Sequence, residues 1–254
     1  MNFVAIIPAR YASTRFPGKP LAMLGGKPII AHVYERVSRT FEHTYVATDD
    51  ERIATAVREF GGRAVMTRSD HRSGTDRCYE AYRLSGVAAD VVVNVQGDEP
   101  FIATSQLEAI QHCFDDERTE IATLVRPFAP DTPWEVLQNP NSPKVVVSDD
   151  DYALYFSRSV IPYLRGKEQS QWAASHTFYK HIGIYAYRVD VLRQVVALPQ
   201  STLELAESLE QLRWLQAGFR VKVGYTDTET IGIDTPADLE RAQIFWDSLS
   251  NHAS

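Results

Sequence analysis

The chain has 254 residues, 44% of them hydrophobic and 23% charged, which are the proportions of an ordinary globular enzyme. The 26 Lys and Arg against 33 Asp and Glu give a formal charge of −7, which argues against nucleic-acid binding but allows a local basic site for small anions. Cys78 and Cys113 lack metal-type spacing, so neither a disulfide framework nor a zinc site is expected. The first apolar run is too short for a signal peptide or a membrane span, so we expect a cytoplasmic protein without a membrane partner.

The first half of the chain alternates short apolar runs with helical patterns. Strands are predicted at residues 3–7, 45–47, 64–66 and 91–95, and helices at 26–39, 50–60, 76–84 and 105–113. The run 91–95 is continuously apolar, as in a central strand covered on both faces. This alternation predicts an α/β fold with a mostly parallel sheet and helices on both sides.

The second half of the chain favours inserted antiparallel strands. Strands are predicted at 145–147, 153–157, 182–187 and 221–225, with a hairpin turn at 149–151. A helix at 203–216 begins with a capping-box pattern, Ser201 with Glu204, and a last helix at 238–249 follows Thr235 and Pro236. We predict a single domain over residues 1–254.

Three cations follow the first strand within ten residues: Arg10, Arg15 and Lys19. Ligands of open α/β sheets bind at the carboxyl ends of the strands, and forked guanidiniums with an ammonium can surround a polyphosphate. The loop is neither a dinucleotide-binding nor a Walker motif, because the required glycines are missing and Pro20 follows Lys19. The alternative is a solvated basic loop.

Two acids are candidate magnesium ligands. Asp98 follows the strand 91–95, and Asp234 precedes the last helix. Magnesium prefers one or two carboxylates together with phosphate oxygens and water. The alternatives are an ordinary turn acid for Asp98 and helix capping for Asp234, and the sequence does not say whether the two acids meet.

Weaker signals lie elsewhere in the chain. Ser73, Gly74 and Thr75 precede a helix, where amides could meet an anion. His181 and Tyr185 lie four apart on a predicted strand and therefore share a face. Each is more often an ordinary structural residue than a ligand.

Taken together, eight motifs in order resemble the 3-deoxy-manno-octulosonate cytidylyltransferases, also called CMP-Kdo synthetases: IPARYASTRFPGKP, ATDDERI, SGTDR, VNVQGDEP, YALYFSRSVIP, HIGIYAYR, ESLEQLR and GIDTPADLE. The resemblance implies a Rossmann-like nucleotide-diphospho-sugar transferase fold and a homodimer. It also implies transfer of CMP from CTP to Kdo, an acidic eight-carbon sugar, for lipopolysaccharide biosynthesis, with Mg²⁺ as cofactor.

The resemblance also implies roles for individual residues. Lys19, Arg10, Asp98 and Asp234 would be catalytic, and the two acids would hold Mg²⁺. The nucleotide would lie against Pro8, Ala9, Arg10, Ser13, Arg15, Lys19, Ser73, Gly74, Thr75 and Gln96. The sugar would lie against Gln96, Arg158, His181, Tyr185, Glu210 and Gln211, with Arg158 facing the sugar carboxylate unless it forms a structural ion pair, for example with Glu210.

Departures from the family pattern are small, and residues 165–179 carry no transferable motif. Phe16 replaces a usual Leu, and Pro143 removes a backbone donor before a strand. Rival functions are a cytidylyltransferase for an amino-substituted octulosonate or another acidic sugar, and a non-catalytic nucleotide or sugar sensor.

Overall fold

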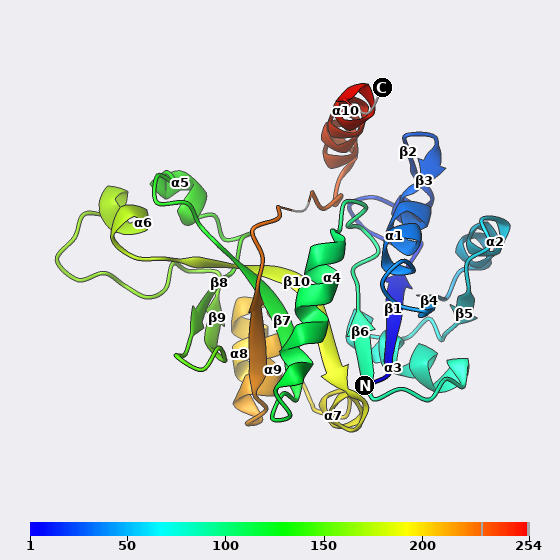
Figure 1. Cartoon of the computed structure of the whole chain (residues 1–254), viewed down its shortest axis with the longest axis horizontal. Coiled ribbons are helices and arrows are strands. Elements are labelled where there is room, and N and C mark those ends of the chain that lie inside the picture. Colours follow the sequence, from blue (N-terminus) through cyan, green and yellow to red (C-terminus); the bar gives the residue numbers. More distant parts are fainter. Residues whose placement is uncertain (230, 253–254) are drawn as a thin grey trace. The chain divides into compact units, whose positions relative to one another are not determined.

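A computed structural model describes residues 1–229 and 231–252 of the chain (Figure 1). The chain forms two compact units: Met1–Leu107 with Glu229–Ser254, and Glu108–Thr228. The second unit is thus an insertion in the sequence of the first. The prediction of one domain over residues 1–254 stays a prediction.

The first unit is built on four parallel strands in the order β6-β1-β4-β5. Figure 1 shows them in blue to cyan with the helices that join them. Its elements are β1 (Phe3–Ala9), η1 (Lys19–Leu21), β2 (Met23–Leu24), β3 (Lys27–Pro28), α1 (Ile29–Val37), β4 (His43–Thr48), α2 (Glu51–Glu59), β5 (Ala64–Met66), α3 (Gly74–Ser85), β6 (Val91–Asn94) and α10 (Pro236–His252). Helix α4 (Thr104–His112) contains the sequence boundary between the units.

Strand burial explains why the segments of β1 and β6 pair with each other. Val4, Ala5, Ile6 and Ile7 of β1 are fully buried, as is the Val91–Val93 part of β6. Continuous apolar runs of this kind suit strands that are covered on both faces. The prediction for residues 91–95 is therefore confirmed as a buried central strand, ending at Asn94.

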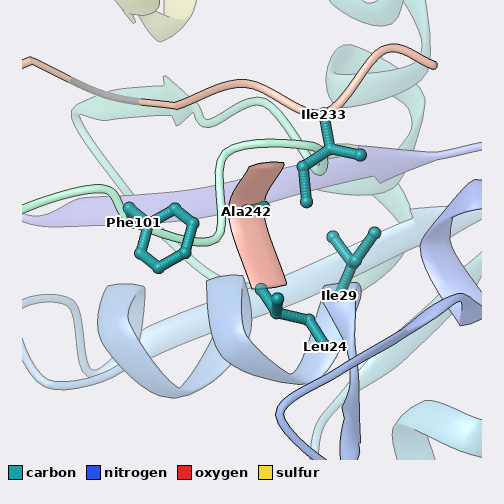
Figure 2. Close-up of a cluster of buried hydrophobic side chains, with 5 residues drawn as sticks. All are labelled: Leu24, Ile29, Phe101, Ile233 and Ala242. Atoms are coloured by element: carbon teal, nitrogen blue, oxygen red, sulfur yellow. The ribbon is translucent and has the colours of Figure 1, made fainter. Parts of the chain in front are cut away.

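A hydrophobic cluster in the first unit joins segments that are far apart in the sequence. It consists of Leu24, Ile29, Phe101, Ile233 and Ala242, and in Figure 2 Ile233 points from the segment before α10 toward Ile29. The partly buried Phe16 packs against the same cluster. Burial of these side chains therefore anchors the first loop, the segment after β6 and the segment before α10 in one place.

The second unit is mainly antiparallel. Strands β11 and β7 pair in parallel, whereas β7–β10, β10–β8 and β8–β9 are antiparallel pairs. Its elements are η2 (Cys113–Asp115), β7 (Ile121–Pro127), α5 (Trp134–Leu137), β8 (Lys144–Val147), β9 (Ala153–Ser157), η3 (Gln169–Gln171), α6 (Trp172–Ser175), β10 (Tyr179–Arg188), α7 (Val189–Val195), α8 (Thr202–Glu207), α9 (Gln211–Gln216) and β11 (Val221–Tyr225). A parallel sheet with additional antiparallel strands confirms the predicted α/β fold class.

Two element predictions are wrong. The predicted helix over 203–216 is two helices, α8 and α9, because Ser208 takes a left-handed conformation with φ of 51° and ends α8. The predicted helix over 26–39 begins only at Ile29, because the β2–β3 hairpin occupies its first residues. Within the described residues, no helix combines the length and the apolar character needed to cross a membrane.

Candidate active site

The first loop is folded back on itself around one carbonyl group. The amides of Ser13 and Gly18 donate to the Tyr11 carbonyl oxygen at 3.0 and 2.9 Å. Gly18 has φ of +71°, a conformation that favours glycine, and it precedes the 3-10 turn η1. Because η1 begins at Lys19, the fold of the loop sets the position from which the Lys19 side chain extends.

The two predicted metal-binding acids are brought together by the backbone. The Ile233 amide donates to the Asp98 carbonyl oxygen at 2.9 Å, which places Asp234 beside the turn after β6. That turn also lies close to β1, because a Cβ on Gly97 would approach the Pro8 carbonyl oxygen to 2.8 Å. Glycine is therefore required at position 97 by the close approach of two backbones.

Two of the three predicted phosphate-binding cations, Lys19 and Arg15, contact the predicted metal-binding acids. Lys19 Nζ lies 2.5 Å from Asp98 Oδ2 and 3.3 Å from Asp234 Oδ1. Arg15 also donates to Asp234 Oδ1, at 3.1 Å. We call these four residues the Lys19 cluster. Its two cations balance two carboxylates, which offsets the desolvation of the ammonium of Lys19, whose side chain is only 14% exposed.

Helix α10 is capped by residues other than Asp234. The Asp238 amide donates to Thr235 Oγ1 at 3.2 Å, and the Asp238 carboxylate accepts from the amides of Asp234 and Thr235. The predicted cap at Thr235 is confirmed. The Asp234 carboxylate is directed to Lys19 and Arg15, so capping is the wrong explanation for this acid.

The amino end of α3 lies beside the end of β1. Ser73 caps the helix, its hydroxyl accepting from the Asp76 amide at 3.1 Å, and Gly74 is the first helical residue. A Cβ on Gly74 would contact the Pro8 ring at 3.4 Å. Three predicted nucleotide-binding positions, Pro8, Ser73 and Gly74, are therefore neighbours, and Thr75 follows them as a buried residue.

The other predicted nucleotide-binding residues have looser surroundings. Arg10 is exposed directly after Ala9, the last residue of β1. Ser13 Oγ accepts from the Phe16 amide at 3.3 Å. Gln96 lies at the start of the turn that leads to Asp98, its carbonyl accepting from the Glu99 amide.

The predicted sugar-binding residues other than Gln96 all lie in the second unit. Arg158 donates from Nε to the Glu207 carbonyl at 2.6 Å, and from its two terminal nitrogens to the carbonyls of Pro140 and Ser208 at 2.9 and 3.1 Å. The partners of its guanidinium are thus backbone carbonyls, two at the α8–α9 junction and one in the loop before β8. A guanidinium has five N–H groups, so two remain for a ligand.

His181 and Tyr185 are brought together on β10, with ring centres 5.3 Å apart, although the strand has a register shift between Ile182 and Tyr185. The Thr123 hydroxyl donates to the Ile184 carbonyl at 2.8 Å, so its oxygen accepts from His181 Nε2, at 3.1 Å. Burial lowers the pKa of His181 to about 3 and raises the pKa of Tyr185. Both side chains are therefore neutral at pH 7 and can exchange hydrogen bonds but not charge.

Two further predicted sugar-binding residues lie at the start of α9. Glu210 accepts from Arg213 at 2.7 Å, and Arg213 also lies 3.4 Å from Glu204. The neighbouring Gln211 is buried, and its Nε2 has no hydrogen-bond partner among the described residues. A buried amide donor without a partner is costly and therefore marks a place where a ligand oxygen could bind.

Sequence reasoning missed residues that shape the site from behind. Arg77 is buried, donates to Thr67 Oγ1 at 2.6 Å and lies 3.2 Å from Asp49, which ties α3 to the ends of β4 and β5. Thr123 fixes the orientation of His181. Arg77 belongs to the quoted motif SGTDR, but nothing in the sequence indicates which loops it joins.

Comparison with protein families shows the broad class to which the chain belongs. A family model described as cytidylyltransferase matches residues 4–228. A chain of similar fold, a 4-diphosphocytidyl-2C-methyl-D-erythritol synthase from Anaerococcus prevotii, is 13% identical with a TM-score of 0.61 over 97% of this chain and 99% of that chain, which shows the fold alone. The chain is thus a nucleotidyltransferase of the cytidylyltransferase class.

Much more similar relatives share one name. A 3-deoxy-manno-octulosonate cytidylyltransferase from Phocaeicola vulgatus is 64% identical over 96% of this chain and 97% of its own length. One from Bacteroides thetaiotaomicron is 63% identical over 98% of this chain and all of its own. A CMP:2-keto-3-deoxy-manno-octonic acid synthetase solved in complex with CTP is 44% identical, with a TM-score of 0.89 over 98% of this chain and 99% of that chain. The chain belongs to the 3-deoxy-manno-octulosonate cytidylyltransferases.

Proposed function

We propose that this chain transfers CMP from CTP to the anomeric hydroxyl of Kdo and releases pyrophosphate, in the cytoplasm, as a homodimer and for lipopolysaccharide biosynthesis. The observation that carries the reaction is the 64% identity to a named relative over nearly the whole chain. The Lys19 cluster supplies the charges that such a reaction needs. In this reaction the sugar hydroxyl attacks the α-phosphorus in line, and the bond to the β-phosphate oxygen breaks.

The first loop is proposed to hold the triphosphate. Arg10, Arg15 and Lys19 would neutralise the charge that accumulates on the departing pyrophosphate, which lowers the barrier by electrostatic stabilisation. Ser13 and the Ser73–Thr75 turn would add hydrogen-bond donors from a hydroxyl and from a helix amino end. Gln96 would lie at the junction of nucleotide and sugar.

The residues present fit a magnesium ion that arrives with its nucleotide. Asp98 Oδ2 and Asp234 Oδ1 both accept from the Lys19 ammonium. The distance between these two oxygens therefore cannot exceed the sum of the two hydrogen-bond lengths. Among the described residues no group of three His, Cys, Asp or Glu could hold a metal, so the remaining ligands would be phosphate oxygens and water. When bound, Mg²⁺ polarises the phosphate and acidifies the attacking hydroxyl.

Binding of nucleotide would exchange the partners within the Lys19 cluster. Lys19 and Arg15 now neutralise the acids that are proposed to hold the metal. With the two carboxylates holding Mg²⁺, the side chains of Lys19 and Arg15 would be available to the triphosphate. The ion pairs thus keep four charged groups paired until the substrate is present.

The sugar is proposed to bind the second unit through Arg158, His181, Tyr185, Glu210 and Gln211. His181 is neutral, because burial holds its pKa at about 3, so it is suited to a sugar hydroxyl rather than to the carboxylate. Arg158 retains two N–H groups beyond its three carbonyl bonds and is proposed to bind the carboxylate.

A pyrophosphate-release assay with CTP, Mg²⁺ and a panel of acidic sugars tests the proposed function. We expect release with Kdo, and much faster release with CTP than with ATP or GTP. Faster turnover of an amino-substituted octulosonate would assign the chain to that rival substrate. Binding of CTP without release under every condition would indicate a sensor instead of an enzyme.

A further inference from the structure

The motif ATDDERI contributes no group to the Lys19 cluster, yet it carries a well-defined set of contacts. Asp50 caps α2, its Oδ1 accepting from the Arg52 amide at 3.0 Å. The same carboxylate accepts from Arg52 Nε at 2.9 Å and from its terminal nitrogen at 2.6 Å. The Asp50 carboxylate therefore binds both the backbone amide and the guanidinium of Arg52. The two guanidinium bonds fix the orientation of the guanidinium plane.

The guanidinium of Arg52 lies on a residue of the first loop. Its Cζ is 3.3 Å from the centre of the Tyr11 ring, the geometry of a cation–π contact. The same ring lies against Gly18, where an added Cβ would be 3.1 Å from two ring carbons. The Tyr11 carbonyl also accepts from the Gly18 amide. Tyr11 thus fixes the residue that immediately precedes Lys19.

We infer that Tyr11, Arg52 and Asp50 form a brace that positions the first loop for CTP. The brace runs from the capped start of α2, through the stacked ring, to Gly18 and so to Lys19. It contributes no group to the triphosphate itself, so its members are positioning residues. This inference rests on the proposed function, since its consequence is the affinity for CTP.

The surroundings of the loop explain why a brace is needed. Although Phe16 is packed, Arg10, Ala12, Thr14 and Arg15 are exposed, so packing alone leaves much of this loop in water. A loop that is ordered only on binding weakens the affinity by the free energy of its ordering. Stacking the loop on a fixed guanidinium removes part of that cost before CTP arrives.

The inference is tested by CTP affinity, measured calorimetrically without Kdo, together with KM for each substrate and kcat. Tyr11→Leu removes the ring, Arg52→Met removes the cation, and Asp50→Ser keeps the helix cap but loses the two guanidinium bonds. We expect each to weaken CTP binding, by about threefold to tenfold, with kcat and KM for Kdo near wild type. Tyr11→Phe retains the ring and should bind CTP as wild type does. The control is Arg58→Met, which breaks the exposed Arg58–Glu51 pair on the same helix.

The double variant Tyr11→Leu/Arg52→Met separates a brace from a direct phosphate contact. In a brace the two losses are not additive, so the double variant should bind CTP no worse than Tyr11→Leu alone. Multiplied losses would show that Arg52 contacts the nucleotide and would overturn the inference. If Tyr11→Leu does not fold, Arg52→Met and Asp50→Ser still test whether loss of the brace weakens CTP binding. Wild-type protein that binds no CTP overturns the proposed function and the brace with it, whereas unchanged binding in the single variants overturns the brace alone.

Discussion

The Lys19 cluster combines two carboxylates that are proposed to hold Mg²⁺ with two cations that are proposed to bind phosphate. The sequence identified all four residues by type and position, but not that Lys19 would contact both acids. That convergence depends on the hydrogen bond from the Ile233 amide to the Asp98 carbonyl, which joins distant segments. Sequence patterns indicate local periodicity and helix caps. A hydrogen bond between residues this far apart in the sequence produces no such pattern.

Replacing either acid by its amide should cripple turnover. Asp98→Asn and Asp234→Asn remove a negative charge from the proposed metal site, a loss of about 4 kcal/mol or roughly a thousandfold in rate. Pyrophosphate release at saturating Mg²⁺ measures the effect. The control is Asp70→Asn, which changes an acid that is 71% exposed in a pair with Arg68. A near wild-type rate in either variant would remove that acid from the metal site.

Lys19 should compete with a divalent cation for the two carboxylates. In Lys19→Met the acids lose their ammonium partner, so free Mn²⁺ should bind at least about tenfold more tightly than to wild type in the absence of CTP. Electron paramagnetic resonance of unbound Mn²⁺ gives the affinity without any turnover. Lys27→Met, which breaks the exposed pair with Glu35, is the matched control. Equal Mn²⁺ affinity in Lys19→Met and wild type would disprove the exchange of partners.

We expect the buried side-chain amide of Gln211 to lower the stability of the protein and to bind the sugar. Gln211→Leu removes an Nε2 that lacks a partner among the described residues, so unfolding should require about 1 kcal/mol more than in wild type. If this amide binds a sugar hydroxyl, KM for Kdo should rise in the same variant while KM for CTP is unchanged. Gln216→Leu, at an exposed position of α9, is the control. A stabilised variant with normal KM for Kdo would leave Gln211 without a sugar contact.

At the level of helices and strands, the sequence predicted the features that depend on neighbouring residues, such as helix caps and buried strands. The cap at Thr235, the capping box at Ser201 and the apolar runs of β1 and β6 are all present. The break between α8 and α9 was missed because Ser208, rather than a glycine, takes the left-handed conformation there. Its carbonyl accepts from Arg158, so a tertiary contact accompanies the break.

Loss of the capping box should destabilise the second unit. In α8 the Ser201 hydroxyl accepts from the Glu204 amide, and the Glu204 carboxylate accepts in return from the Ser201 amide. Ser201→Ala should lower the free energy of unfolding by about 1 kcal/mol, while Ser201→Thr retains the cap. Urea denaturation measures both. Equal stability of the alanine and threonine variants would mean that the cap contributes nothing.

For the molecule as a whole, the chain order predicted α/β alternation but not the division into two units. The predicted phosphate and metal residues lie in the first unit, and all predicted sugar residues except Gln96 lie in the second. The sequence did predict antiparallel strands in the second half of the chain, where β7–β10, β10–β8 and β8–β9 are antiparallel pairs. It did not predict the boundary itself, which falls within the single helix α4.

Stability should fall on acidification because of His181. Burial lowers the pKa of His181 to about 3 in the folded protein, whereas the side chain has its ordinary pKa of 6.5 in the unfolded chain. Between these values the unfolded chain binds more protons than the folded one, so the contribution of His181 is complete above pH 6.5 and is lost as the pH falls toward 3. The slope approaches about 1.4 kcal/mol per pH unit in this window.

His181→Gln isolates this contribution, because glutamine keeps a donor for Thr123 but does not titrate. The unfolding free energy of wild type minus that of the variant should decrease steadily from pH 7 to pH 4.5, as followed by denaturant titration of the intrinsic tryptophan fluorescence. One of the four tryptophans, Trp214, packs on Tyr185 at 5.0 Å. His112→Gln, at a side chain that is 76% exposed, is the control for the loss of a histidine elsewhere in the chain. A pH-independent difference for His181→Gln would mean that folding does not lower the pKa of the imidazole.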